Sequence, residues 1–462
     1  MRHSDRPLGT ALSQRNYGRR DVIKLAGTFG ALGSLGLLGA CSNEDSKPQS
    51  GGKTGGKAKT VTLTYWTWMN SEDVKNPRAA AQGKIIKAFM AANPDVRIVE
   101  QVVPWQELGQ QLLQAVAAGK APDVSRQRDG MLQDLVASKS LEELDEFVKD
   151  WSGERKKDYF YNWDDTVVGG HKYAFRQSIR AANRLYYRTD LYQAAGFSSP
   201  PVTAEEFLAV SKATTKGDTS GFLQAFSKAD GLSNFMQQCP SMYWSLGSDL
   251  VDESGKPTFH EDAGQEIFTF YQDAAWKHGV MPSRVATMNS DGTADVFVGG
   301  GSASHLTHSA EWGDWSTRET LKGRLSTANT FSFGSDGKPA PINTAGAWLL
   351  VMPRGAQKEA AWRFMEFMQS KEAELIDSQT AKELPTRRST AKDPWFKSDD
   401  ASYIATLLAD MQKYEHPATT LRIKKYSQLS LILADAAQEI IANKADVAAT
   451  LASAASTYKA AL

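Results

Sequence analysis

The order of strand and helix patterns between residues 61 and 128 places the strongest limit on the fold. The segment "VTLTYWTWMN" alternates apolar residues with threonine, as a half-buried strand does, and Ile85 and Phe89 then follow at helical spacing up to an Asn-Pro pair. A second alternation at residues 96–102, a helix pattern that ends at Gly119 and a short strand at "APDVS" complete the series. This β-α-β-α-β order predicts a parallel sheet with right-handed crossovers, and therefore an α/β fold.

Four polar or aromatic residues come directly after two of these strand patterns. Trp68 and Asn70 follow the first strand, and Arg128 and Asp129 follow the third. Ligands of open parallel sheets bind beyond the carboxyl ends of the strands. We therefore expect these four side chains to share one rim of the sheet and to include binding residues.

The segment "LYYRTDLYQAAGFSSPPVTAEEF" predicts a strand, a short helix, a turn and a second helix. Asp190 can cap the short helix, and Gly196 supplies its left-handed end. Thr203 and Glu206 have the spacing of a capping box, which marks the start of the second helix. Apolar residues at helical spacing in the C-terminal part of the chain predict further helices.

The first 40 residues have the pattern of an export signal. "GRRDVIKLAG" carries a twin-arginine pair, and the apolar stretch Leu25–Leu38 is shorter than the roughly 20 apolar residues that a membrane helix needs. The stretch ends in "LGAC", which resembles a bacterial lipobox, so residues 1–40 are predicted to be a lipoprotein signal peptide and Cys41 to carry the lipid. Residues 41–60 are polar and rich in Gly, Ser and Lys, which predicts a flexible tether. An ordinary cleavage site with a chance cysteine is the alternative.

Charge, length and cysteine content narrow the class of protein. Residues 1–40 hold six of the 53 Lys and Arg but only two of the 53 Asp and Glu, so the remaining chain is mildly acidic. That balance disfavours nucleic acid as a partner. About 420 residues exceed what one core usually serves, which predicts two domains. Cys239 is the only other cysteine, so a chain lipidated at Cys41 has no intrachain disulfide.

One long segment, "GGHKYAFRQSIRAANRLYYRTDLYQAAGFSSPPVTAEEF", resembles a stretch of the maltose-binding-like group of bacterial extracellular solute-binding proteins. It departs from their pattern at Arg176, at Arg188-Thr189 and at Ala204, where proline, Asn-Lys and tryptophan are usual. Three further matches occur in family order: "GKAPDV" with "LEELDEF" behind it, "DVFVGGGSASHLTHSAEW", and "INTAGAWLLVMPRGAQKEAAWRFMEFM" with "LPTRRS" behind it. Together the four matches cover most of the chain beyond the signal peptide.

The resemblance implies a two-lobed fold of the periplasmic-binding-protein type II, in which each lobe is a mostly parallel sheet flanked by helices. The first lobe would comprise residues 61–175 and 346–390, and the second lobe residues 179–343 and 393–462. By analogy, the chain would cross between the lobes at a hinge near Phe175–Ile179, Asn343–Trp348 and Arg388–Lys392. Closure of such a hinge buries a ligand between the rims of the two lobes.

The resemblance also implies a function. The protein would be an exported receptor, held by the Cys41 lipid on the outer face of the cell membrane, that binds a carbohydrate, in particular an oligosaccharide. It would deliver this ligand to the permease of an ABC importer, and it would act as a monomer without enzymatic activity, cofactor or metal. Sugar rings stack on Trp and Tyr, and their hydroxyls need polar partners. The expected ligand-binding residues are Trp68, Asn70, Arg128, Asp129, Tyr243, Trp244, Trp312, Trp348 and Tyr426, with a place in the core as the alternative for the aromatic ones.

Two other functions stay open at this point. Within the family, the ligand could be a polyol or a phosphodiester. Outside it, His305, His308 and Glu311 have a spacing that could bring zinc ligands onto one helical face, as an exported zinc hydrolase would need. Against the zinc site, the spacing is not that of HExxH, and "GGGSAS" before it is typical of a strand and turn.

Overall fold

The computed structural model describes residues 60–462 apart from residues 231–234, 345–347 and 417–422. The predicted signal peptide, Cys41 and all of the predicted tether except Thr60 lie outside the described residues. Among the helices that the structure describes, none combines the length and the apolar character that a membrane crossing requires.

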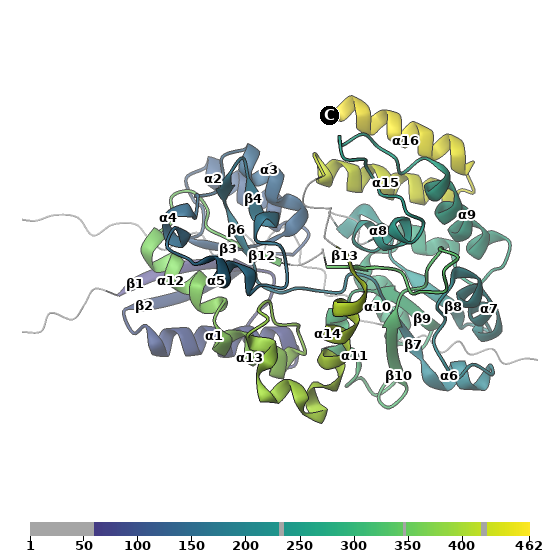
Figure 1. Ribbon diagram of the computed structural model, residues 1–462, viewed down its shortest axis with the longest axis horizontal. Helices are drawn as coiled ribbons and strands as arrows, with labels where there is room; N and C mark the ends of the chain where they lie inside the picture. The colour runs from purple at the N-terminus through teal and green to yellow at the C-terminus, as the bar shows by residue number, and fades with distance from the viewer. Residues whose placement is uncertain (1–59, 231–234, 345–347, 417–422) are drawn as a thin grey trace, which may run out of the picture. The chain divides into compact units, whose positions relative to one another are not determined.

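Two larger sheets, each flanked by helices, organise the described chain, and two further sheets have two strands each (Figure 1). One sheet has five strands in the order β2-β1-β3-β12-β6, and the other has four strands in the order β10-β7-β9-β8. We name the part built on the five-stranded sheet the first lobe and the part built on the four-stranded sheet the second lobe. This arrangement confirms the predicted two-lobed α/β fold.

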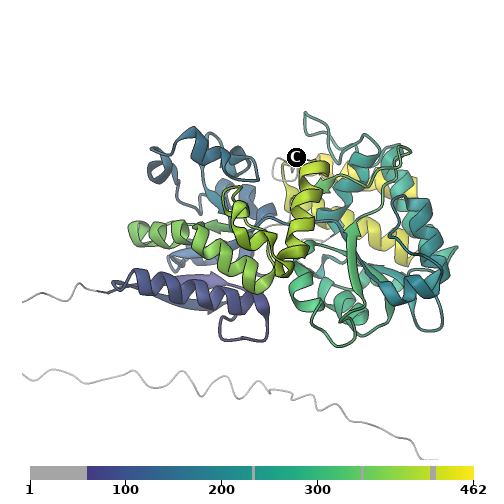
Figure 2. The same ribbon diagram turned by 60° about the horizontal axis from the view of Figure 1, so that its bottom comes forward.

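The first lobe contains most of the N-terminal half of the described chain and a return segment from further along. Its elements are β1 (Val61–Thr67), α1 (Pro77–Ala92), β2 (Val96–Val102), α2 (Leu108–Ala117), β3 (Val124–Arg128), α3 (Leu132–Ala137), α4 (Asp145–Val148), α5 (Gly153–Lys157), β4 (Val167–Val168), β5 (His171–Lys172), β6 (Ala174–Arg176), β12 (Trp348–Val351), α12 (Lys358–Met368) and α13 (Lys371–Ala381). Helices α1, α12 and α13 run side by side in both views (Figures 1 and 2).

The second lobe contains the middle of the chain and its C-terminal helices. Its elements are β7 (Arg184–Arg188), α6 (Thr189–Ala194), α7 (Ala204–Thr214), β8 (Ser220–Gln224), α8 (Phe235–Ser245), α9 (Asp262–Trp276), α10 (Ser290–Val298), β9 (Ser302–Thr307), α11 (Trp312–Trp315), β10 (Leu325–Asn329), β11 (Ile342–Asn343), α14 (Ser402–Tyr414), β13 (Glu415–His416), α15 (Tyr426–Ala442) and α16 (Val447–Ala461). Helix α15 packs against both α9 and α16.

Strand directions are more mixed than the sequence predicted. In the first lobe β1 is parallel to β2 and β3, as expected, but β12 is antiparallel to β3 and β6. In the second lobe β7 is antiparallel to β9 and β10, and only β8 and β9 are parallel. The expectation of mostly parallel sheets is therefore wrong for the second lobe. Strands β7 and β12 reach their sheets from the opposite lobe, so no helical crossover sets their direction.

Local signals in the sequence explain several element boundaries. The side chain of Asn76 caps α1 and Pro77 occupies its first position, where a missing N–H costs nothing. The predicted capping box of Thr203 and Glu206 is present at the start of α7. Asp190 does not cap α6 as predicted, because it lies in the first turn and pairs with the Arg188 side chain instead.

The described residues place three passages of the chain between the two larger sheets. The first passage joins β6 to β7, and the second joins β11 to β12. The third passage runs from Ser389 to Tyr403. At its start, the N–H of Ser389 donates to Asp158 in the first lobe. At its end, the hydroxyl of Tyr403 lies 3.1 Å from the hydroxyl of Tyr186 on β7. The predicted multi-crossing hinge is thus present, while the residue limits predicted for the lobes stay predictions.

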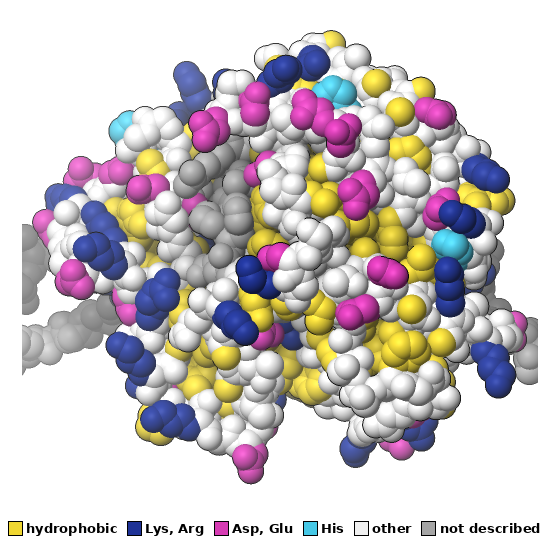
Figure 3. All heavy atoms as spheres, turned by 45° about the vertical axis from the view of Figure 1, so that its right-hand side comes forward, with side chains coloured by type: hydrophobic (Ala, Val, Ile, Leu, Met, Phe, Trp, Pro, Cys, Tyr) yellow, Lys and Arg dark blue, Asp and Glu magenta, His cyan; other side chains and the backbone are white. Residues whose placement is uncertain are grey.

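Surface charge on the described chain is mixed. Figure 3 shows acidic and basic side chains interspersed over the visible face, with hydrophobic side chains in the hollows between them. Ion pairs such as Arg363 with Asp95 (2.7 Å) and Lys358 with Glu142 (2.8 Å) join groups of opposite sign at the surface. Exposed pairs of this kind contribute little to stability.

Candidate ligand-binding site

A cavity of about 220 Å³ lies where the two lobes meet, and side chains from both lobes line it. We name it the main cavity. Its lining residues are Trp68, Asn76, Arg78, Trp105, Arg128, Arg180, Gln237, Ser290, Asp291, His308, Glu311, Asp314 and Trp348.

The ends of the strands position these side chains. Trp68 follows β1, Trp105 follows β2, Arg128 ends β3, and His308 follows β9. These are the carboxyl ends, where open α/β sheets form their crevices. Arg180 lies on the first passage between the lobes, so the hinge itself supplies part of the wall.

Three tryptophans give the main cavity its aromatic surface. The rings of Trp68 and Trp348 are stacked, with centroids 5.6 Å apart and planes 29° apart. The guanidinium of Arg128 lies 5.1 Å from the ring of Trp105, and that of Arg78 lies 5.8 Å from the ring of Trp68. Aromatic faces beside charged groups suit ligands that have both apolar faces and polar edges.

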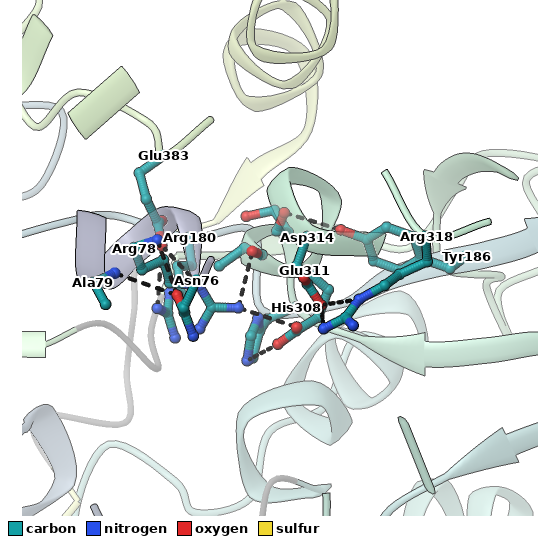
Figure 4. Close-up of polar contacts among 12 residues, drawn as sticks. Asn76, Arg78, Ala79, Arg180, Tyr186, His308, Glu311, Asp314, Arg318 and Glu383 are labelled. Atoms are coloured by element: carbon teal, nitrogen blue, oxygen red, sulfur yellow. Dashed lines mark hydrogen bonds and ion pairs between the residues drawn. The ribbon is translucent and has the colours of Figure 1, made fainter. Parts of the chain in front are cut away.

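Arg78 joins the two lobes across the main cavity (Figure 4). It projects from the first turn of α1 in the first lobe and donates to the carbonyl of Ala310 and to Glu311 in the second lobe, each at 3.0 Å. It also lies 3.7 Å from Glu383. Burial lowers the pKa of Arg78, but Glu311 and Glu383 outweigh burial and the net shift is upward. Arg78 therefore stays charged and holds the two rims together.

Two further arginines are buried at the same site. Arg128 donates to the carbonyl of Asp230 at 2.9 Å, which makes a second bond between the lobes. Arg180 lies 3.4 Å from Glu383, while its Nε has no hydrogen-bond partner in the described chain. Burial lowers the pKa of both guanidinium groups. In Arg180, the Nε donor is left for an oxygen atom of a ligand.

His308 supplies a group of a different kind. Its Nε2 lies 3.3 Å from Glu311, and its Nδ1 is buried without a partner in the described chain. Burial, together with Arg180 and Arg78, holds the pKa of His308 well below its usual range, so the ring is neutral at pH 7. A neutral ring that donates from Nε2 to Glu311 leaves Nδ1 as an acceptor.

The structure brings three of the predicted binding residues together at the main cavity: Trp68, Arg128 and Trp348. Asn70 is not among its lining residues. It is exposed on the loop after β1, and its Oδ1 accepts the N–H of Glu72 at 3.1 Å. Asp129 is buried beside Arg128, and its Oδ1 accepts the N–H of Gly130 at 2.8 Å.

The other predicted binding residues pack elsewhere in the second lobe. Tyr243 is fully buried and donates its hydroxyl to the carbonyl of Phe259 at 3.0 Å. Trp244 lines a separate surface hollow, and Tyr426 is buried with its hydroxyl 3.4 Å from the carbonyl of Met236. Trp312 stacks on Tyr403 of α14, with centroids 4.6 Å apart and planes 10° apart.

Most of the polar lining of the main cavity lies outside the set of residues predicted from the sequence. Arg78, Arg180, Trp105, Asp291 and Glu311 were not among the predicted binding residues. Applying the carboxyl-end rule to every strand pattern, rather than to the first and third alone, would have reached Trp105 after β2. Arg180 does not follow a strand pattern in this way, because its position at the main cavity depends on how the two lobes meet.

The zinc alternative finds no support in the geometry of its residues. His305 is buried in β9 against the rings of Phe297 and Trp315, and burial lowers its pKa to about 4. Within the described chain, the only group of three possible ligand atoms within 4.8 Å of one another belongs to Glu143, Asp145 and His171, which lie elsewhere in the first lobe.

The fold and the interlobe cavity define a class of ligand-binding proteins, and comparison with known proteins gives the family. Residues 47–375 match the model of the bacterial extracellular solute-binding proteins, and this chain belongs to that family. The family comprises extracellular binding proteins rather than enzymes, which makes this chain an exported one. A curated binding protein of Brucella abortus (strain 2308) is 24% identical over 342 residues, which cover 71% of this chain and 78% of the relative.

Solved structures with the same fold include sugar and polyol complexes. Maltose-bound MalE3 of T. maritima has a TM-score of 0.74 at 22% identity, covering 87% of this chain and 100% of that chain. The GacH receptor of Streptomyces glaucescens, solved unliganded and with acarbose, has a TM-score of 0.70 at 20% identity, covering 87% and 98%. A solute-binding protein of Agrobacterium radiobacter K84 with ribitol has a TM-score of 0.71 at 21% identity, covering 88% and 100%.

Proposed function

We propose that the protein is the receptor of an ABC importer for a carbohydrate, in particular an oligosaccharide, and that the ligand binds in the main cavity. Membership of the solute-binding family supports the receptor role. The maltose, acarbose and ribitol named for proteins of the same fold support a polyhydroxylated ligand.

One observation carries the choice of ligand. Three buried polar atoms of the main-cavity lining have no partner in the described chain: Nε1 of Trp68, Nε of Arg180 and Nδ1 of His308. The first two are donors and the third is an acceptor. A ligand that satisfies all three must both accept and donate hydrogen bonds. A hydroxyl group does both, whereas a carboxylate or phosphate only accepts and an ammonium only donates.

The aromatic surface supports the same ligand. A pyranose has apolar faces formed by its C–H groups, and Trp68, Trp105 and Trp348 offer ring surfaces of matching character. The proposed contacts are therefore stacking on these tryptophans and hydroxyl hydrogen bonds to His308 and Arg180. Of the binding residues expected from the sequence, Trp68, Arg128 and Trp348 remain in this proposal.

Attachment to the membrane through the Cys41 lipid is also part of the proposal. The apolar stretch before "LGAC" supports it. Stable anchoring takes more than one acyl chain, which lipoproteins of this type carry. The Cys41→Ser variant should leave the membrane fraction as a soluble exported protein, or keep its signal peptide. Mature-sized Cys41→Ser protein that still sediments with membranes would contradict lipid anchoring.

A thermal-shift screen tests the ligand class. A receptor is stabilised by what it binds, by about 2.7 kcal/mol at 100 times the Kd, which corresponds to a few degrees in Tm. The panel comprises neutral oligosaccharides, ribitol, amino acids, peptides and polyamines. We expect oligosaccharides to raise Tm and amino acids, peptides and polyamines to leave it unchanged. A screen in which only charged compounds raise Tm would contradict a carbohydrate ligand.

Two variants then test the site by calorimetric titration with the saccharide that raises Tm. Trp68→Ala should weaken binding about tenfold or more, because it removes a stacking face and a donor. Trp312→Ala is the matched control, since its indole stacks on Tyr403 and does not line the main cavity. Equal loss of affinity in both variants would move the ligand away from the main cavity.

A further inference from the structure

A second cavity of about 220 Å³ adjoins the main cavity. Its walls come from α2 and the loop before it in the first lobe and from the beginning of α15 in the second lobe. The lining residues are Trp105, Gln106, Leu108, Gly109, Gln110, Arg128, Met131, Ser427, Gln428 and Leu431. Trp105 and Arg128 line both cavities, so the two spaces meet at this pair.

The character of the second cavity differs from that of the main cavity. Trp105, Leu108, Met131 and Leu431 contribute apolar side chains to its wall. The hydroxyl of Ser427 is already bonded to Asp134 across the lobes. The main cavity, in contrast, is lined by three arginines, two aspartates, a glutamate and a histidine.

Leu431 is the exposed part of this apolar wall. It is 37% exposed, which places it among the few large hydrophobic side chains of the described chain that meet solvent to this extent. Scattered exposed leucines are ordinary on protein surfaces. This leucine, however, lines a hollow together with three other apolar side chains and several polar ones, and an apolar group bound there would remove it from water.

We propose that the second cavity is a subsite for an apolar, ring-sized group attached to the sugar, so that the ligand is a glycoside with an apolar aglycone. This inference rests on the proposed carbohydrate function of the main cavity. A dry cavity of about 150 Å³ lined by apolar side chains holds benzene, so the volume here accommodates one aromatic ring. The shared Trp105 can contact both the sugar and the aglycone, because it lines both cavities.

An apolar probe tests the subsite without any sugar. We expect phenol to bind the wild-type protein, with saturation-transfer NMR as the measurement. Leu431→Asp should abolish the signal, and Leu431→Ala should weaken it. Val99→Asp is the matched control, because Val99 is 39% exposed on β2 and lies outside both cavities. Absence of phenol binding, or equal binding to the Leu431→Asp and Val99→Asp variants, would overturn the subsite.

Matched glycosides then test the link between the two cavities. Phenyl and methyl glycosides of the same sugars are compared by titration, and the phenyl forms should bind about tenfold more tightly or better, because they bury an additional ring. Leu431→Asp should bring the two forms close to parity. Equal affinity of the two forms for the wild-type protein, or tighter binding of unsubstituted longer oligosaccharides, would overturn the aglycone preference. If no sugar binds in either form while phenol does, the carbohydrate function fails and the apolar subsite stands.

Discussion

At the scale of single residues, Lys172 has the most unusual environment of the described lysines. Its side chain is buried, its Nζ donates to the carbonyl of Trp163 at 2.6 Å, and the same nitrogen lies 3.7 Å from the centre of the Trp163 ring. Burial lowers the pKa of Lys172 to about 7, despite the nearby Asp164 and Asp165. In the unfolded chain the same side chain has the ordinary lysine pKa of about 10.4 and therefore stays protonated up to about that pH.

The lowered pKa of Lys172 predicts a pH-dependent stability. Between about pH 7 and pH 10 the unfolded chain binds more protons than the folded one at this site, so its contribution to the free energy of unfolding rises with pH. The slope is at most about 1.4 kcal/mol per pH unit. We expect Lys172→Met to lose this rise, as measured by urea unfolding from pH 7 to pH 8.5.

The exposed Lys75 provides the control for this measurement. Lys75→Met should keep the pH slope of the wild-type protein, since no burial acts on that side chain. Parallel pH profiles for the wild type and the Lys172→Met variant would show that Lys172 keeps an ordinary pKa. The pH range ends at 8.5 because of Cys239, whose pKa burial raises well above its usual range. At higher pH the unfolded chain loses the thiol proton while the folded chain keeps it, so this group lowers the free energy of unfolding as pH rises.

At the scale of the elements, the capping box of α7 gives a prediction about stability alone. Thr203 Oγ1 accepts the N–H of Glu206 at 3.2 Å, and Glu206 accepts the N–H groups of Val202 and Thr203 at 2.7 and 3.2 Å. Thr203→Ala should lower the free energy of unfolding by about 1 kcal/mol in urea titration. Thr203→Ser should retain most of the stability, and both variants should bind ligand as the wild type does.

Elements of this kind could be predicted because their signals are local. Each signal depends on neighbours within a few positions of the chain. Examples are the Asn-Pro pair that ends α1, the positive φ of Gly196 and the capping box of Thr203. The direction of β12 could not be predicted in the same way, because its partner β3 lies far back in the sequence and the chain reaches it from the second lobe. Pairing across such a distance depends on the assembled fold, which local patterns do not encode.

The roles of the tryptophans show the same limit at the binding site. Trp68 follows its strand directly and lines the main cavity, so the carboxyl-end rule was sufficient. Trp312 also follows a strand, but its ring stacks on Tyr403 from α14 and does not line the main cavity. No sequence pattern around Trp312 predicts its contact with Tyr403. An aromatic residue after a strand is therefore a sound candidate, and its neighbours in space decide between pocket and core.

At the scale of the whole molecule, Glu311 and Arg78 should set the balance between open and closed lobes. They form a 3.0 Å ion pair from opposite lobes, with side chains only 20% and 17% exposed. Hydrogen bonds to charged groups contribute about 1.5–3 kcal/mol, so Glu311→Gln should lower the ratio of closed to open molecules about tenfold or more. The unliganded variant should show a larger radius of gyration in solution scattering and a faster release of ligand.

An ion pair within the second lobe provides the control for this prediction, because breaking it removes a charge without removing a bond between the lobes. Arg318 bonds Asp314 at 2.9 Å, and both belong to the second lobe (Figure 4). Arg318→Gln should change neither the radius of gyration nor the release rate. A Glu311→Gln variant with wild-type dimensions and release rate would show that the Arg78 pair does not control closure.

The burial of Cys239 has a practical consequence for measuring the opening and closing of the lobes. It is the one cysteine among the described residues, it is fully buried in α8, and the raised pKa of its thiol keeps it protonated and unreactive at neutral pH. A soluble version of the chain that begins after Cys41 would therefore offer no competing thiol to maleimide dyes. One cysteine introduced on the surface of each lobe could carry a donor and an acceptor fluorophore, and the chain would become an optical reporter of its own ligand.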